Sequence, residues 1–501
     1  MKKFLISGLM GIFCSQTMAQ NDMDAIRYTN KKFGSTAKSM SLAGAVGSLG
    51  ADVSTASVNP AGLAQFQKGE FSFSMGFVNS KNTSTYLGNS VADNTFNMNL
   101  PNLGLVFANK TLTKKGERGW KNYTIAFNLA RVADFNRVVN FSGTNTHTSL
   151  MDYFAERATL ANLTVDQLLV TDSEKEEGFE SKTSMAYYAY LFDSIGNRKY
   201  AAHASPIFHS IYQKGVMQQS GGMNEYNFSV AGNYSDVVYL GATINYTTVN
   251  FKENRTHSES NDPEDNQALS MDNFTYTENL HTTGGGFSGR LGMIVKPHDY
   301  VRLGASIQTP QIIKLDDEYD FKINSTLRNG EYYNFESKKG IYTYSLLTPA
   351  RYTFSATGII GKRGFVSADI EKVDYSAMRL RSTDGNNAME IANDDIRSKY
   401  TSAINYRIGG ELVMEEFRLR GGFASYASPF INKETNNLRS DFVTGGFGIK
   451  EKNWALDLGI VHALGQDVFQ PYVLNDNSRP QVQVHNKFSV NTVIITLTTK
   501  F

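Results

Sequence analysis

The sequence predicts an all-β protein, a fourteen-stranded antiparallel transmembrane β-barrel with a small N-terminal helical hatch in the lumen. Three observations predict it: apolar and polar residues alternate along many stretches, short polar turns alternate with long loops, and no apolar run after the N-terminus approaches the roughly 18 residues of a membrane helix. Backbone groups in lipid must be paired within the protein, so a closed barrel is the remaining way to span a bilayer.

The alternation is clearest at the C-terminal end of the chain. One face of the expected strand carries Val493, Ile495, Leu497, Thr499 and Phe501, and the other is mostly threonine and lysine. The same two-residue period occurs in seven further stretches: 124–131, 226–234, 301–308, 365–371, 403–412, 417–425 and 454–460. In five of these stretches the charged residues fall on the polar face. An Arg or Lys facing lipid at mid-membrane costs about 2–4 kcal/mol, so the charges fix which face looks inward.

Turns and loops give the strand number. Short polar turns are expected near 114–121, 235–236, 297–299, 362–364, 415–416 and 450–453, and long loops near 83–97, 143–220, 255–278, 326–343, 382–400, 428–440 and 470–486. These connections join fourteen strands and place both ends of the barrel in the periplasm. Within the longest loop, Asp152 to Leu169 has helical spacing. A soluble β-sandwich is the weaker alternative, because it predicts shorter strands and no signal peptide.

The N-terminal residues 1–19 are expected to be a signal peptide. Lys2 and Lys3 precede a short apolar core, and Thr17-Met18-Ala19 forms a plausible cleavage site. The only cysteine, Cys14, would be the lipidated residue of a lipoprotein, but bulky Phe13 before it disfavours that reading. The sequence therefore divides into a signal peptide, a non-alternating hatch at 20–68 and a barrel at 69–501.

Composition argues against several functions. The formal net charge is +1, which offers no electrostatic basis for nucleic acid binding. The eight histidines show no metal-binding spacing, Gly284-Gly285-Gly286 precedes a strand and not a helix, and no local motif selects a catalytic Ser/His pair. We therefore expect no catalytic residue, no metal and no cofactor.

A motif in the hatch region gives the family resemblance. Residues 38–64 contain Ser39-Met40, Gly44-Ala45 and Asn59-Pro60-Ala61-Gly62-Leu63, and the segment resembles the N-terminal plug of the FadL/TodX family of outer-membrane transporters. The likeness continues more loosely at 348–350, 369–375, 410–411 and 418–422 and in the C-terminal strand. It implies a plugged fourteen-stranded barrel in the bacterial outer membrane that carries long-chain fatty acids or aromatic hydrocarbons. The family's ligand-pocket side chains have no match here, so the substrate-binding residues stay unknown.

The resemblance and the turn chemistry together select candidate functional residues. Asn59, Pro60 and Ala61 are expected at a turn that faces the barrel wall, because proline fixes φ and ends a helix. The segment either gates passage or only plugs the lumen. The terminal aromatic Phe501 is expected to be the assembly signal.

The expected partners follow from the same reading. They are a hydrophobic small-molecule ligand, outer-membrane lipid and lipopolysaccharide, and the barrel assembly machinery, and the protein is expected to be a monomer. The alternative function is a structural or adhesive surface barrel whose long external loops bind partners.

Overall fold

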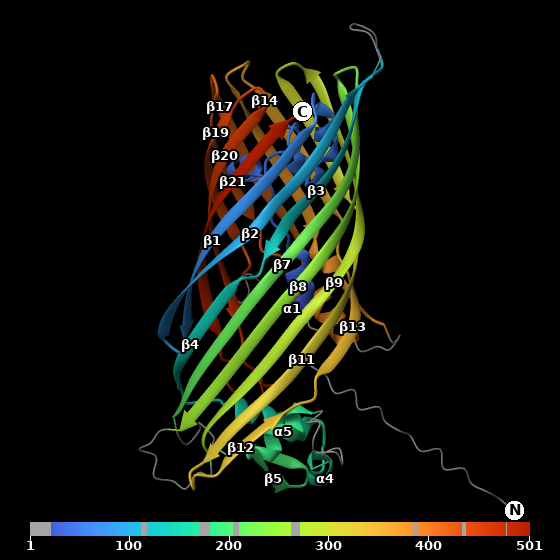
Figure 1. Cartoon of the computed structure of the whole chain (residues 1–501). Coiled ribbons are helices and arrows are strands. Elements are labelled where there is room, and N and C mark those ends of the chain that lie inside the picture. Colours follow the sequence, from blue (N-terminus) through green and yellow to red (C-terminus); the bar gives the residue numbers. More distant parts are fainter. Residues whose placement is uncertain are drawn as a thin grey trace, which may run out of the picture.

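The fold is a closed barrel that encloses short N-terminal helices (Figure 1). This computed structural model describes residues 22–111, 118–169, 181–203, 210–261, 271–383, 389–432, 437–476 and 478–501. The expected signal peptide and Cys14 lie outside these residues. The helices are α1 (Asp22–Thr29), α2 (Ala37–Ser41), η1 (Val53–Ser57), η2 (Pro60–Gln65), α3 (Leu150–Leu160), α4 (Val165–Leu168), α5 (Lys182–Tyr188), η3 (Tyr375–Ala377) and α6 (Glu390–Lys399). None of the described helices combines the length and apolar character needed to cross a bilayer.

The strands form one large sheet and one small hairpin. The large sheet contains β1 (Glu70–Tyr86), β2 (Asn89–Lys110), β3 (Trp120–Asp134), β4 (Arg137–Asn145), β7 (Ile211–Tyr234), β8 (Val238–Asn261), β9 (Met271–His298), β10 (Val301–Gln308), β11 (Ile312–Leu327), β12 (Tyr332–Glu336), β13 (Gly340–Leu347), β14 (Arg351–Ile359), β15 (Gly364–Asp374), β16 (Arg379–Ser382), β17 (Ser402–Met414), β18 (Phe417–Tyr426), β19 (Ser440–Lys450), β20 (Trp454–Phe469) and β21 (Val484–Lys500). The hairpin is β5 (Phe192–Gly196) with β6 (Lys199–Ala202).

The predicted fourteen-stranded barrel is confirmed. Four strands of the barrel wall are each broken into two segments: β3 with β4, β10 with β11, β13 with β14, and β15 with β16. The nineteen segments of the sheet therefore form fourteen wall strands, with β12 as an additional short segment at the outer end. Closure comes from β1, which pairs with β2 on one side and with β21 on the other, from Glu70↔Lys500 to Thr85↔His485. The closed ladder leaves no open edge at this seam, as lipid requires.

The predicted strand faces are confirmed in all seven stretches and at the C-terminal end. In β21, Val493, Ile495 and Leu497 are exposed on the outer surface, and in β15 Asp369 and Glu371 are buried on the inner side. The outward faces are rich in Leu, Ile, Val and Phe, which is the surface that lipid requires. The energetic cost of a charge facing lipid was therefore sufficient to set the register.

The connections between strands differ from the expected ones mainly at the outer end of the barrel. The turn at Ser235-Asp236 is confirmed: both residues have positive φ, as a type I′ turn requires, and the Val237 N–H donates to the Tyr234 carbonyl at 3.1 Å. The expected long loop at 83–97 is wrong: β1 and β2 continue through it as paired strands and turn at Leu87-Gly88. The helix expected at 152–169 is split into α3 and α4. These helices, α5 and the β5–β6 hairpin form a small outer domain at the end of the barrel remote from the C-terminus (Figure 1).

Candidate functional site: the hatch, an apolar chamber and an interrupted wall

Side chains of the wall hold the hatch by its backbone. Arg290 of β9 donates to the Ala56 carbonyl at 2.9 Å, and Arg351 of β14 donates to the Thr29 carbonyl at 2.5 Å. In the opposite sense, the carboxylate of Asp369 accepts the Gly47 N–H at 3.1 Å. Short helices leave many of their own backbone N–H and C=O groups without hydrogen-bond partners. The charged side chains of the wall supply these partners to the hatch.

The Asn59-Pro60 turn is a buried attachment point between the hatch and the wall. The Asn59 side chain is buried, donates to the Gly47 carbonyl at 2.7 Å and to the Met293 carbonyl of β9 at 3.1 Å, and accepts the Ala61 N–H at 3.2 Å. Pro60 then begins η2, where its missing N–H costs no helical bond. A single amide thus joins the turn to the hatch and to the wall.

Glycines of the wall make room for this turn. A Cβ atom on Gly292 would lie 1.9 Å from the Asn59 Oδ1 atom, and one on Gly241 would lie 2.3 Å from the Pro60 carbonyl carbon. Gly304 on the next strand similarly faces the Gly47 carbonyl. Because these glycines have no Cβ atom, the backbone of the hatch can lie close to the backbone of the wall. Any larger residue would push the hatch inward.

A layer of buried charges lies between hatch and wall. Its core pair is Lys31 with Glu225 at 2.8 Å, and Arg351 with Glu371 at 3.1 Å continues it. The remaining members of the layer are Arg290, Arg407 and Asp369. Buried charges are tolerated when they are paired, and each of these side chains has an ion-pair partner, although Asp369 Oδ1 and Arg407 Nε and Nη2 make no hydrogen bond with the described residues. The layer therefore presents a strongly polar barrier across the lumen.

Outside this layer, α1 projects into an apolar chamber. We define the α1 chamber by the side chains packed around Ile26 and Tyr28: Val132, Met223, Val249, Phe251, Ile313, Leu315, Tyr344, Leu346, Val373, Tyr375, Met378, Leu380, Ile396, Tyr400 and Phe430. Its one helical cation, Arg27, is paired with Asp24 and lies over the Phe251 ring with its guanidinium carbon 4.2 Å from the centroid. The chamber is thus mostly apolar and filled by its helix, and the buried carboxylates of Asp24, Glu253 and Asp317 border it.

An outer loop clamps the start of α1. Lys399, the last residue of α6, lies 3.1 Å from the Asp22 carboxylate, and the Tyr400 hydroxyl donates to the same carboxylate at 2.9 Å. Burial acts to lower the pKa of Lys399, but the carboxylates of Asp22 and Asp395 raise it above its usual range. The hatch is therefore tied to an outer loop as well as to the wall.

The wall is interrupted beside the chamber. The ladder between β2 and β3 runs from Lys110↔Asn122 to Asn102↔Ala130 and stops there. Beyond it, the described segment Asn89–Leu100 of β2 pairs with β1 alone, and β4 pairs with β7 alone. We call this missing ladder the wall gap. In the picture, β2 and β4 separate below the label of β3 (Figure 1).

Side chains bridge the wall gap in place of backbone bonds. The Asp134 carboxylate accepts from the Asn97 and Asn99 side chains of β2 at 3.2 and 2.9 Å, and Arg131 Nε donates to the same oxygen at 3.1 Å. Further out, Asp93 of β2 accepts the Asn140 N–H of β4 at 2.8 Å. We call the first set the Asp134 clip. The outward residues of β2 here are Phe96, Met98 and Leu100, so the gap opens towards an apolar surface.

The hatch touches the inner side of the gap. The Lys32 N–H donates to the Val132 carbonyl of β3 at 3.2 Å. A Cβ on Gly34 would lie 2.3 Å from the Arg131 carbonyl oxygen. The Tyr28 ring of α1 packs edge-on against Phe135, with 6.2 Å between ring centroids. The chamber, the hatch and the gap are therefore one contiguous structure.

Comparison with solved structures identifies the fold. The toluene transporter TodX of Pseudomonas putida superposes with a TM-score of 0.51 at 12% identity, over 94% of this chain and 99% of that one. A FadL homologue of Pseudomonas aeruginosa superposes with a TM-score of 0.54 at 12% identity, over 93% and 98%. The chain has the FadL/TodX fold. No family model matches it, and no curated protein does either.

Within the FadL/TodX fold, the sequence-predicted residues take separate places. Asn59, Pro60 and Ala61 lie together on the inner wall. Phe501 lies on the outer surface of the barrel wall, where its side chain is 63% exposed. Its N–H donates to the Gly69 carbonyl at 3.0 Å, and its ring packs edge-on against Phe107. Among the described residues, no three side chains of His, Cys, Asp or Glu are placed to hold a metal ion.

Sequence reasoning missed the α1 chamber and the wall gap. The chamber is assembled from nine or more distant segments, none of which has a local signature. The gap did leave a trace: Arg131 falls on the apolar face and Val132 on the polar face, which breaks the alternation of 124–131 just before Asp134. That break in period was the available signal for an interrupted strand.

Proposed function

We propose that this protein carries hydrophobic small molecules across the bacterial outer membrane and releases them sideways, through the wall gap, into the bilayer. The observation that carries the proposal is the contiguity of the apolar α1 chamber with a wall that lacks its backbone ladder. The solved structures of the same fold are described as transporters of toluene and as a FadL homologue, which supports the same class of substrate.

The charged layer argues against a straight path through the lumen. A hydrophobic molecule in the chamber would have to pass Lys31, Glu225 and their neighbours, and then displace a hatch attached at Asn59. Separating a buried ion pair leaves an uncompensated charge and costs about 3–5 kcal/mol. The wall gap requires only that a few side-chain hydrogen bonds open.

The lipid side of the gap suits an apolar product. Phe96 is 63% exposed and Met98 is 56% exposed, and both point outward beside the missing ladder. Met98 lies opposite the outward Phe77 of β1, so a molecule leaving beside Met98 enters hydrocarbon, and its transfer is favoured by roughly 25 cal/mol for each Å² of apolar surface. Polar solutes gain nothing by the same route.

The chamber favours uncharged substrates. Arg27 is neutralised by Asp24 and covered by Phe251, so it offers no free charge to a carboxylate. A long-chain fatty acid would have to bring its anion into an apolar site, or be taken up in protonated form. We therefore expect aromatic or aliphatic hydrocarbons to pass more readily than fatty acid anions.

A cross-linking experiment tests the route. Asn99→Cys and Asp134→Cys, joined by a short bifunctional thiol reagent, would fix the gap closed, and uptake of labelled toluene should fall at least tenfold. Lys81→Cys with Asn94→Cys, opposite each other in the intact β1–β2 ladder, is the matched control and should leave uptake unchanged. Full uptake with the gap cross-linked would refute lateral release, and no toluene or oleate uptake above protein-free vesicles would refute transport itself.

Variants of the hatch turn test gating. Asn59→Ala leaves the buried Gly47 and Met293 carbonyls without the amide, at a cost of about 1–3 kcal/mol. Pro60→Gly removes the restriction on φ at the same turn. If the hatch gates passage, both variants alter toluene uptake while the barrel still folds, as judged by its heat-modifiable migration. Unchanged uptake at equal surface abundance would favour a passive plug.

A further inference from the structure

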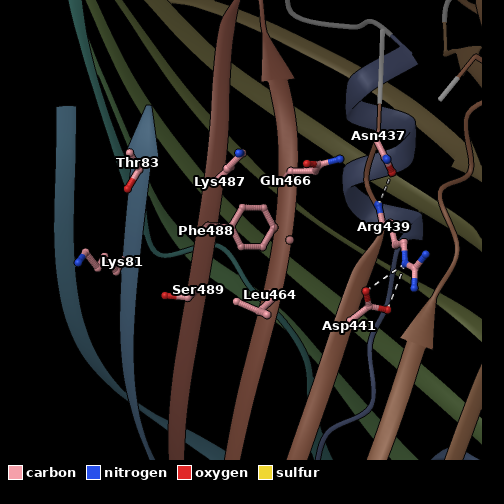
Figure 2. Close-up of a pocket in the computed structure, with 11 residues that line it drawn as sticks. Lys81, Thr83, Asn437, Arg439, Asp441, Leu464, Gln466, Lys487, Phe488 and Ser489 are labelled. Carbon is pink, nitrogen blue, oxygen red and sulfur yellow. Dashed lines mark hydrogen bonds and ion pairs between the residues drawn. The ribbon is translucent and has the colours of Figure 1, made fainter. Parts of the chain in front are cut away.

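The outer surface of the barrel carries a depression where the lipid-facing residues give way to polar ones. It has a volume of about 830 Å³ and lies across the first and the last three strands of the barrel (Figure 2). Its lining includes Lys81 and Thr83 of β1, Leu464 and Gln466 of β20, and Lys487 of β21. Arg439 and Asp441 at the start of β19 complete one side, joined by an ion pair of 3.0 Å.

The depression lies at the outer edge of the apolar belt. On β1 the outward positions Phe71 to Phe77 are apolar, and Asn79 and Lys81 follow them. On β21, the outward positions Leu497, Ile495 and Val493 are apolar, and the outward positions from Asn491 onward, towards the outside, are polar. About nine residues of tilted strand span a membrane, so both polar stretches fall at the level of the outer headgroups.

Lys81 and Lys487 form a pair of like charges in this place. Ladder register puts Lys81 opposite Ser489 and Thr83 opposite Lys487, so the two lysines are diagonal neighbours on the outward face. Such neighbours have Cα atoms roughly 7–8 Å apart. Neither lysine has an ion pair among the described residues, whereas Arg439 is already paired with Asp441. The depression therefore has an excess of two positive charges at the membrane surface.

We propose that the depression binds a phosphate group on the headgroup of an outer-leaflet glycolipid, the phosphorylated lipid A part of lipopolysaccharide. A phosphate carries the charge and the acceptor oxygens that two unpaired ammonium groups require. Leu464, half exposed and level with Lys81 and Ser489 in the ladder, contacts the first part of an acyl chain, and Gln466 offers an amide to the sugar. The proposal rests on outer-membrane placement and not on transport.

Lipid binding to purified folded protein tests this site directly. The probes are bisphosphorylated lipid A, the same lipid without phosphates, and phosphatidylglycerol, each added to the barrel in a neutral detergent and followed by native mass spectrometry. Two lysines near a charged surface are together worth about tenfold or more in affinity, so Lys81→Ala with Lys487→Ala should weaken binding of bisphosphorylated lipid A by that factor. Lys81→Arg with Lys487→Arg should retain it.

Lys372 supplies the matched control. It also points outward from its strand, but its ladder neighbours are Tyr352 and Ile404, so it stands alone among apolar side chains. Lys372→Ala should leave lipid A binding unchanged. The proposal is overturned if the double alanine variant, folded by heat-modifiable migration, binds like the parent, if Lys372→Ala loses as much, or if phosphatidylglycerol binds as tightly as lipid A.

Discussion

The continuous wall and the wall gap are built from the same kind of strand but held together differently. Between β17, β18, β19 and β20, every neighbour pair is joined by an unbroken antiparallel ladder. Between β2 and β4 the strands run side by side with no ladder, and a few carboxylate and amide side chains join them. The backbone hydrogen bonds of a ladder form with almost any side chains, whereas the contacts across the gap depend on particular residues such as Asp134 and Asp93.

This difference separates folding from function. A ladder within lipid opens only at the cost of several unpaired backbone groups, so the continuous wall is effectively permanent. A side-chain hydrogen bond contributes a net of only about 0.5–1.5 kcal/mol, or up to about 3 kcal/mol with a charged partner. The Asp134 clip can therefore open on its own while the rest of the barrel stays closed.

The largest effect is expected where wall and hatch approach most closely. Gly241→Val places a side chain against the Pro60 backbone, which has no room to yield, and overpacking of this kind costs about 1–3 kcal/mol or more. We expect η2 to leave the wall, with severalfold faster entry of a small polar dye into vesicles that contain the variant. Gly358→Val is the control, because nothing lies within 4 Å of a Cβ there. Equal permeability of the two variants would contradict this view of the hatch.

Removal of Phe501 tests whether the seam needs more than its ladder. The deletion leaves every β1–β21 pair from Glu70↔Lys500 onward in place and removes one backbone bond to Gly69. If Phe501 is the assembly signal, the folded fraction in the membrane should fall severalfold, and Phe447→Ala, an outward aromatic in mid-wall, should lower it much less. Equal heat-modifiable folding of parent and deletion would leave the seam explained by its ladder alone.

The continuous wall was predictable from sequence, whereas the gap showed only as a local break in alternation. Alternation assigns Arg407, Asp457 and Leu458 to their faces because lipid penalises any other register. The hatch turn at Asn59-Pro60 was also predictable, since proline restricts its own backbone. The gap arises from tertiary contacts instead: Asp134 meets Asn97 and Asn99 from a different strand, and no local pattern encodes that meeting.

A smaller effect is expected from the Asp134 clip itself. Asp134→Ala removes both bonds to β2 and should speed amide hydrogen exchange at Asn97–Leu100 by roughly tenfold, with thermal stability nearly unchanged. Asp441→Ala removes a side-chain bond to Ser425 across an intact ladder and is the control. Exchange near Asp441 should not change, because its neighbours keep their backbone bonds. Equal acceleration at both places would show that the gap is no weaker than the wall.

The smallest effect concerns the clamp between the outer loop and α1. Lys399→Ala removes a half-exposed ion pair with Asp22 but leaves the Tyr400 hydroxyl on the same carboxylate, so the loss should be at most about 1 kcal/mol. Tyr400→Phe removes the buried partner and should cost more, while keeping the ring contact with Phe430. Limited proteolysis within α1 should follow the order parent, Lys399→Ala, Tyr400→Phe and then the double variant, with the barrel strands resistant throughout. If the clamp helps to hold α1 in the chamber, toluene uptake changes in the same order. If proteolysis follows this order while uptake stays constant, movement of α1 is not the step that limits passage, and control lies at the wall gap.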